Sequence, residues 1–245
     1  MKTILRRAYG LFCYALALAT ILYAALYFGN IRLPKTIDGF GAAPLGHALL
    51  VNTALLIGFA VQHSGMARPA CRRFTAHWLS GRLVRSTYVL ASSLAVTLLM
   101  LCWQPIGIVV WQADNTWVSG ALTGVYYSGW MLIAWATFLI DHLELFGLRQ
   151  TWEKGNRGAC REPEFQTPGL YRHVRHPINL GWMIVLWATP VMTVTRLVLA
   201  GGLTAYVLVG TRLEELRLEA RFPLYRQYAR KVPAFLPSLR RRLDH

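Results

Sequence analysis

The sequence predicts an all-α integral membrane protein. We expect one helical bundle of about five to six transmembrane helices, with the last pair a hairpin and an interfacial helix near the C-terminus. Of the 245 residues, 55% are hydrophobic and only 15% are charged, which is typical of a membrane protein. Several apolar segments are long enough to cross a bilayer. Lys and Arg are also distributed unevenly among the segments that connect them.

The apolar segments define the expected helices, at about residues 8–29, 45–66, 86–111, 119–140, 178–193 and 196–212. The fifth is short and ends near Thr189-Pro190, so it should form a tight hairpin with the sixth. Beyond them, Leu218, Phe222 and Tyr225 recur at helical spacing among arginines, which indicates an interfacial helix that Pro223 breaks or restarts. The first segment is too long for a removed signal peptide and should remain as a helix. We find no internal repeat or linker and expect a single domain over 1–245.

Basic residues predict the orientation of this bundle. With both termini in the cytoplasm, all but three of the 26 Lys and Arg residues fall on the cytoplasmic side, the exceptions being Arg32, Lys35 and Arg196. The positive-inside rule therefore favours a multi-pass protein of a bacterial inner (cytoplasmic) membrane, with cytoplasmic N- and C-termini. The net charge of +15 is then explained by topology and the lipid bilayer's anionic headgroups, and nucleic-acid binding is not expected.

Connecting segments carry further expectations. Residues 68–85 should form a basic loop facing lipid headgroups, and 104–118 an external loop with an aromatic belt. Residues 147–170 are rich in turn formers and are a candidate lid. Cys13, Cys71, Cys102 and Cys160 show no paired spacing, so neither a disulfide framework nor a metal site is expected.

Polar clusters lie at the cytoplasmic ends of several expected helices. They include Gln62-His63, Asp141-His142, His173 to His176, and Glu214-Glu215. Each cluster alone is compatible with wetted interfacial groups or ion pairs, although polar groups at membrane depth are often functional. Pro177 should begin a helix, whose positive end and N–H groups favour an anion. Because the clusters share one depth, we expect them to line one pocket open to both cytosol and membrane.

Two stretches of the C-terminal third then resemble a known family. They are Tyr171-Arg-His-Val-Arg-His-Pro-Ile-Asn-Leu-Gly181 and the pattern from Glu214-Glu215 through Tyr225-x-x-Tyr228 to Val232-Pro233-x-Phe235-x-Pro237. Both resemble integral-membrane methyltransferases of the isoprenylcysteine carboxyl methyltransferase type. Residues 61–69, 85–90 and 138–150 look like the bacterial methanethiol S-methyltransferases, and proteins of the NnrU type share parts of the pattern.

The resemblance implies that S-adenosylmethionine is held by residues of about 146–237. Transferred residue by residue, the cofactor-binding set is Tyr171, His173, Arg175, His176, Asn179, Gly181, Glu214 and Glu215. Asn179 stands where the family usually has Tyr or Phe, so an aromatic contact is lost or replaced. Pro223 stands where a small residue is common.

The expected reaction is S-methylation of methanethiol, a small thiol, to dimethyl sulfide. Because the thiolate is the nucleophile and simple alkanethiols titrate well above neutrality, a base or positive field is needed. The candidate catalytic residues are His142, polarised by Asp141, and His63. Candidate substrate-binding residues are Gln62, Arg85 and Tyr88, and no metal is required.

Two alternatives remain open at this point. The same cofactor could serve another thiol, a lipid or an isoprenylated cysteine. In a different class, the chain could be a non-catalytic NnrU-like accessory protein or a small transporter. Binding of S-adenosylhomocysteine separates the second class from the enzymes.

Overall fold

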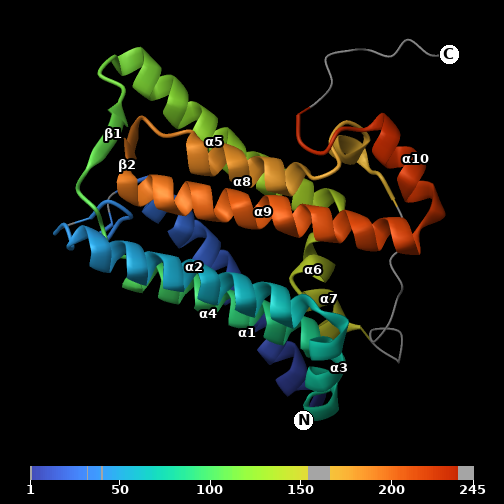
Figure 1. Cartoon of the computed structure of the whole chain (residues 1–245). Coiled ribbons are helices and arrows are strands. Elements are labelled where there is room, and N and C mark those ends of the chain that lie inside the picture. The colour runs from blue at the N-terminus through green and yellow to red at the C-terminus, as the bar shows by residue number, and fades with distance from the viewer. Residues whose placement is uncertain (1, 32, 40, 154–165, 237–245) are drawn as a thin grey trace.

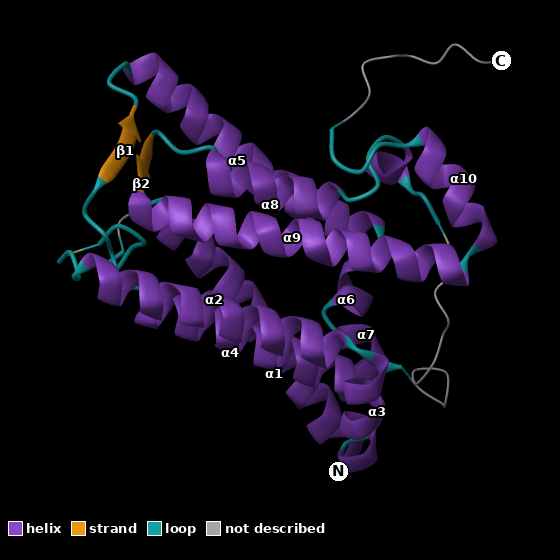
Figure 2. Ribbon diagram, viewed as in Figure 1, coloured by secondary structure: helices purple, strands orange, loops and turns teal. Residues whose placement is uncertain are grey.

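The computed structural model describes residues 2–31, 33–39, 41–153 and 166–236, and these are almost entirely helical (Figure 2). Arg32, Cys160 and Pro237 therefore lie outside the described residues, as does half of the candidate lid at 147–170.

Six helices form the body of the protein: α1 (Lys2–Phe28), α2 (Leu45–Ala67), α4 (Val84–Cys102), α5 (Thr116–Leu139), α8 (Pro177–Trp187) and α9 (Val194–Arg221). Shorter elements are α3 (Pro69–Trp78), α6 (His142–Leu145), α7 (Leu148–Trp152), a 3₁₀ helix (Gly169–Arg172), α10 (Pro223–Lys231) and the strands β1 (Val109–Gln112) and β2 (Val191–Thr193).

The expected membrane bundle is confirmed. By length and composition α1, α2, α4 and α9 can each cross a membrane. Helix α5 has a comparable 24 residues, which is about 36 Å of helix. Helix α8 has only 11 residues, about 16 Å, and is too short to cross a hydrocarbon core of about 30 Å. The short fifth helix and the hairpin that it makes with α9 are thus both present.

The six helices form two layers, with α1, α2 and α4 in one and α5, α8 and α9 in the other (Figure 1). Within the layers α4 packs on α1 and α2, while α8 packs on α5 and α9. The layers meet where α2 packs on α9, and the Tyr126 hydroxyl on α5 donates to the Ala25 carbonyl on α1 at 2.6 Å. Succeeding long helices run in opposite directions, so the start of α1 and α10 lie at the same end (Figure 1).

The contact between α5 and α8 depends on two glycines. A Cβ at Gly181 would lie 2.6 Å from Ile133 Cγ1 and 2.9 Å from the Gly129 carbonyl oxygen. A Cβ at Gly129 would in turn lie 3.0 Å from the Gly181 carbonyl oxygen. All three distances are below ordinary van der Waals contact, so the two backbones approach too closely for any side chain.

The structure corrects two predictions, the end of the third helix and the loop at 68–85. The third helix ends at Cys102 rather than near 111. The side-chain amide of Asn52 binds the backbone of Gln104 just beyond this end: it accepts from Gln104 N at 2.9 Å and donates to Gln104 O at 2.8 Å. Pro105 follows, and the chain then forms β1, which pairs antiparallel with β2. The basic loop at 68–85 contains an unexpected helix, α3, with Pro69 in its first turn.

The apolar core lies toward the strand end of the bundle. The largest fully buried side chains there are Tyr27, Ile37, Met100, Trp103 and Met192. Helices α3, α6, α7 and α10 gather at the opposite end, together with the N-terminus (Figure 1). Close apolar packing therefore holds one end, and the titratable residues collect at the other.

Candidate functional site

The polar clusters occupy one end of the bundle, as their positions in the sequence predict. His63 lies near the end of α2, Tyr88 in the first turns of α4, and His142 directly after α5. His176 immediately precedes α8, and Glu215 lies in the last turns of α9. Because these helices alternate in direction, their ends meet at the end that carries α6, α7 and α10 (Figure 1).

The most closely connected cluster is built around Glu215. Its Oε1 lies 2.6 Å from Arg175 Nη2, 2.8 Å from Arg175 Nε and 3.1 Å from His176 Nε2. The Tyr225 hydroxyl also donates to it, at 3.4 Å. The carboxylate is buried, and this set of charged partners offsets its desolvation.

Arg175 also joins the two halves of the C-terminal sequence pattern. Its Nη1 donates to the carbonyls of Ala229 at 2.8 Å and Val232 at 2.5 Å, and its backbone N–H donates to Pro233 O at 2.9 Å. The backbone N–H of His176 donates to Ala234 O at 3.1 Å. These bonds fix the segment after α10 against the start of α8.

Glu214 differs from its neighbour in being open to a ligand. Its side chain is 58% exposed, against 11% for Glu215, and its Oε2 lies 3.8 Å from His176 Nδ1. His173 is also exposed. In this part of the structure Glu215 therefore holds the cluster together, while Glu214 and His173 present polar groups outward.

Asn179, Tyr171 and Gly181, the other predicted cofactor-binding residues, contact neighbouring elements outside the Glu215 cluster. The Asn179 amide donates to Thr211 Oγ1 at 2.9 Å, which joins α8 to α9 where the related family has an aromatic residue. The Tyr228 hydroxyl donates to the Tyr171 carbonyl at 2.5 Å. Burial raises the pKa of Tyr228 to about 12, so that donor keeps its proton. Gly181 lies in the α5–α8 contact, against the backbone of α5 and the Ile133 side chain.

His63 stands in a second cluster, between α2, α4 and α9. Its Nε2 lies 2.9 Å from the Tyr88 hydroxyl and its Nδ1 lies 3.1 Å from Ser92 Oγ. Phe59 stacks on the imidazole at 5.3 Å between ring centroids. One residue further along, Ser64 Oγ bonds to the Tyr206 hydroxyl on α9 at 2.9 Å.

Arg85 extends this cluster toward α6. Its guanidinium lies 5.1 Å from the Tyr88 ring centroid, and its Nε donates to the Leu145 carbonyl at 2.7 Å. Gln62 donates to Met66 Sδ, and its Oε1 is buried without a hydrogen-bond partner among the described residues. A buried acceptor of this kind is costly unless a ligand or water donates to it.

His142 forms a third cluster with residues of α1 and α5. Its Nε2 lies 3.0 Å from the Tyr14 hydroxyl, and its Nδ1 lies 2.8 Å from Thr137 Oγ1. Phe138 stacks on one face at 4.3 Å, nearly parallel, and Phe146 lies 4.8 Å away. Burial lowers the pKa of His142 from 6.5, against the opposing effect of the Asp141 charge, so the imidazole is neutral at pH 7.

Asp141, which we expected to polarise His142, acts on the imidazole through its charge and makes its own hydrogen bonds elsewhere. Its backbone is left-handed, with φ 87°, and its Oδ1 caps α6 by accepting from Glu144 N at 3.0 Å. Its Oδ2 forms an ion pair with Arg149 Nη1 at 2.6 Å. Thr137 takes the place beside Nδ1, while both carboxylate oxygens of Asp141 are engaged with Glu144 N and Arg149.

The clusters are connected unevenly. Arg85 links the His63 cluster to the turn that follows His142, through Tyr88 and Leu145. Tyr206 and Glu214 lie two turns apart on α9, about 12 Å along one helix. Among the described residues no hydrogen bond, ion pair or ring contact joins His63 or His142 to His176, so a pocket common to all three remains a prediction.

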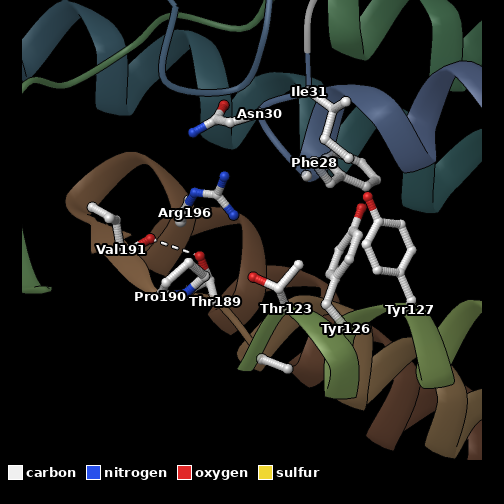
Figure 3. A pocket seen from close by; sticks show the side chains of 12 residues that line it. Phe28, Asn30, Ile31, Thr123, Tyr126, Tyr127, Thr189, Pro190, Val191 and Arg196 are labelled. Carbon is white, nitrogen blue, oxygen red and sulfur yellow. Dashed lines mark hydrogen bonds between the residues drawn. The ribbon is translucent and has the colours of Figure 1, made fainter. Parts of the chain in front are cut away.

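A separate pocket of about 180 Å³ lies at the strand end of the bundle, far from these clusters (Figure 3). Its polar groups have partners: Arg196 Nε donates to Asp38 at 2.6 Å, Tyr126 donates to Ala25 O and Thr189 donates to Val191 O. None of the candidate site residues lines this pocket, whose wall is formed by Phe28, Gly29, Asn30, Ile31, Thr123, Tyr126, Tyr127, Ala188, Thr189, Pro190, Val191 and Arg196.

Several contacting residues were missed by sequence reasoning, namely Tyr14, Ser92, Thr137 and Tyr206. Each is a hydroxyl side chain within an apolar helix, where such residues are common and uninformative. Their position in the sequence was the one signal that could have identified them. Tyr14 is a polar residue within the apolar run of α1, and Thr137 lies five residues before His142.

Comparison with known proteins gives a consistent family. The model of the "NnrU protein" family matches residues 51–239. A methanethiol S-methyltransferase of Crocosphaera subtropica is 42% identical, covering 94% of this chain and 91% of the relative. One from Mycobacterium tuberculosis is 41% identical, covering 97% and 98%. Nurim of Pan troglodytes is 33% identical and covers 74% of each chain. No solved structure matches.

Proposed function

Because the chain belongs to the NnrU protein family and resembles methanethiol S-methyltransferases along nearly its whole length, we propose that it is a membrane methyltransferase acting on methanethiol. The reaction would form dimethyl sulfide, with S-adenosylmethionine as methyl donor. The observation that chiefly supports this is the similarity, which extends over both the C-terminal cluster and the His63 and His142 clusters.

The C-terminal cluster suits the proposed cofactor. S-adenosylmethionine carries an ammonium, a carboxylate and a ribose, and when bound it supplies a methyl group on a positively charged sulfur. The exposed Glu214 carboxylate would accept from the ammonium or ribose hydroxyls, and the exposed His173 would donate to the carboxylate. The first turn of α8 adds backbone N–H groups. Arg175, His176 and Glu215 would hold these groups in position.

The His63 and His142 clusters, at the same end of the bundle, suit a small thiol. The protein's task is to align the thiol sulfur and to remove its proton. His142 and His63 are the candidate bases, since each imidazole lies among aromatic rings at the bundle end. Gln62, the residue before His63 in α2, offers a buried acceptor, Oε1, without a partner among the described residues. An apolar thiol can reach such a site directly from lipid, which is a physical reason for building it in a membrane.

The direct test uses the full chain purified in detergent with S-adenosylmethionine labelled on its methyl group. With methanethiol we expect labelled dimethyl sulfide in the headspace, and its absence would rule out the proposed substrate. Equilibrium binding of S-adenosylhomocysteine is the companion measurement. A chain that binds it but methylates only longer thiols or lipids would keep the cofactor and lose the substrate, and a chain that does not bind it is not this enzyme.

The proposed orientation places this site at the cytoplasmic surface, where the cofactor is available. Arg72 and Arg73 on α3 and Arg226 and Arg230 on α10 lie at the same end as the site, in agreement with the positive-inside rule. Cysteine accessibility at the N-terminus and at the Asp114 loop in inverted and right-side-out vesicles tests it. Labelling of the N-terminus from the outside would reverse the orientation.

A further inference from the structure

The Tyr14 hydroxyl covers the only nitrogen of His142 that can accept a proton. Thr137 Oγ1 donates its single hydrogen to the Ala134 carbonyl at 2.7 Å. It can therefore only accept from His142 Nδ1, 2.8 Å away, which places the ring proton on Nδ1. The lone pair of the neutral ring is then on Nε2, where Tyr14 donates to it at 3.0 Å.

Other approaches to this lone pair are restricted. Phe138 covers one imidazole face at 4.3 Å, with 10° between the ring planes. Phe146 lies 4.8 Å from the imidazole and 5.9 Å from the Tyr14 ring. A substrate that lies against this aromatic group therefore meets the oxygen of Tyr14 before it meets the imidazole.

We propose that Tyr14 is a catalytic residue that relays the proton of the thiol substrate to His142. The thiol S–H bond breaks as its proton binds the Tyr14 oxygen, and the Tyr14 O–H bond breaks as its own proton moves to His142 Nε2. Sulfur keeps the electron pair and becomes a thiolate, and His142 becomes an imidazolium. Tyr14 is unchanged overall, so no oxidant, reductant or metal is needed. This inference rests on the proposed thiol methylation.

The hydrogen bonds at His142 serve both states of the relay. Before transfer, Nδ1 donates to Thr137 and Nε2 accepts from Tyr14. After transfer, Nδ1 still donates to Thr137, and Nε2–H donates to the Tyr14 oxygen. No heavy atom has to move, which keeps reorganisation small. The Asp141 charge favours the imidazolium, and the proton then leaves to water at the helix end.

The second imidazole lacks this arrangement. His63 meets the hydroxyls of Tyr88 and Ser92, at 2.9 and 3.1 Å. Neither hydroxyl donates to a carbonyl among the described contacts, so either nitrogen of His63 can carry the proton. Of these two imidazoles, His142 is the one whose accepting nitrogen is fixed by its hydrogen-bond partners.

Tyr14→Phe tests the relay, because it removes the hydroxyl and keeps the ring that packs against Phe146. With methanethiol we expect kcat to fall by about 100-fold, within the usual range for a general acid–base group. With a small fluorinated alkanethiol, assayed at a pH above its own pKa so that it enters as the thiolate, the variant should work within about twofold of wild type, since no proton remains to be removed. The matched control is Tyr9→Phe, which removes a hydroxyl bonded to Thr87 one turn earlier on the same helix and should leave both rates unchanged.

A second readout does not depend on turnover. In the complex of the protein with S-adenosylhomocysteine and methanethiol, the ultraviolet absorbance of bound thiolate should be present in wild type and strongly reduced in Tyr14→Phe. Equal losses of kcat with both thiols, or unchanged thiolate absorbance, would overturn the relay and leave a structural role. A wild type that does not methylate methanethiol would instead overturn the proposed function, so the two failures are distinguishable.

Discussion

Arg175 and Glu215 form a buried ion pair between the start of α8 and the end of α9, with Nη2 and Oε1 2.6 Å apart. The same guanidinium donates to the carbonyls of Ala229 and Val232, so one side chain joins three segments. The pair couples the charged motif before α8 to the acidic motif in α9, because each buried charge has the other as its counter-charge.

Glu215→Gln should destabilise the protein. The substitution leaves the Arg175 guanidinium buried without its counter-charge, and removing one partner of a buried pair costs about 3 kcal/mol. We expect a lower midpoint of unfolding in detergent, followed by near-ultraviolet circular dichroism. Glu219→Gln, on the same helix, is the control and should leave the midpoint unchanged. An unchanged midpoint for Glu215→Gln would mean that solvent screens the pair.

Glu214→Gln should affect ligand binding rather than folding. The carboxylate is 58% exposed, so its charge contributes little to stability. If it accepts from the cofactor, its loss should weaken S-adenosylhomocysteine binding about tenfold, equivalent to about 1.4 kcal/mol. Calorimetric titration measures the dissociation constant. An equal affinity with an intact fold would remove Glu214 from the proposed cofactor site.

The buried state of His142 predicts a pH dependence. Burial lowers its pKa in the folded protein below 6.5, so between the two values the unfolded chain binds a proton that the native protein does not. Native stability therefore rises with pH through this window and is lost as pH falls below about 6.5. For the same reason the acid limb of kcat/KM should lie below 6.5. His142→Gln should flatten the stability change, and a limb above 6.5 would contradict the assignment.

Gly129→Ala should disrupt the contact between α5 and α8. The added Cβ would lie 2.9 Å from Val185 Cγ2 and 3.0 Å from the Gly181 carbonyl oxygen. Overpacking of this kind costs about 1–3 kcal/mol. Gly124→Ala, on the same helix, meets no atom within 4 Å and should be neutral or slightly stabilising, since Ala favours helix. Thermal unfolding of both variants measures the difference, and equal midpoints would show that the helices can separate at no cost.

Much of the fold followed from local pattern. Apolar length predicted the long helices, and Thr189-Pro190 predicted the early end of α8 at Trp187. Pro223 did restart a helix, since α9 ends at Arg221 and α10 begins with Pro223. The end of α4 was not predictable in this way, because Asn52 of another helix binds the backbone of Gln104. The strand pair β1–β2 likewise joins segments that are distant in the sequence.

The sequence by itself determined the membrane class, the helix directions and the gathering of titratable residues at one end. Hydropathy, charge asymmetry and helix-breaking residues are properties of single segments, so they can be recognised in the sequence alone. Tertiary structure decided which partner each titratable group has: Thr137 and Tyr14 beside His142, Arg175 beside Glu215, and Arg149 beside Asp141. Those pairings depend on how helices rotate and approach one another, which side-chain packing sets and no single segment encodes.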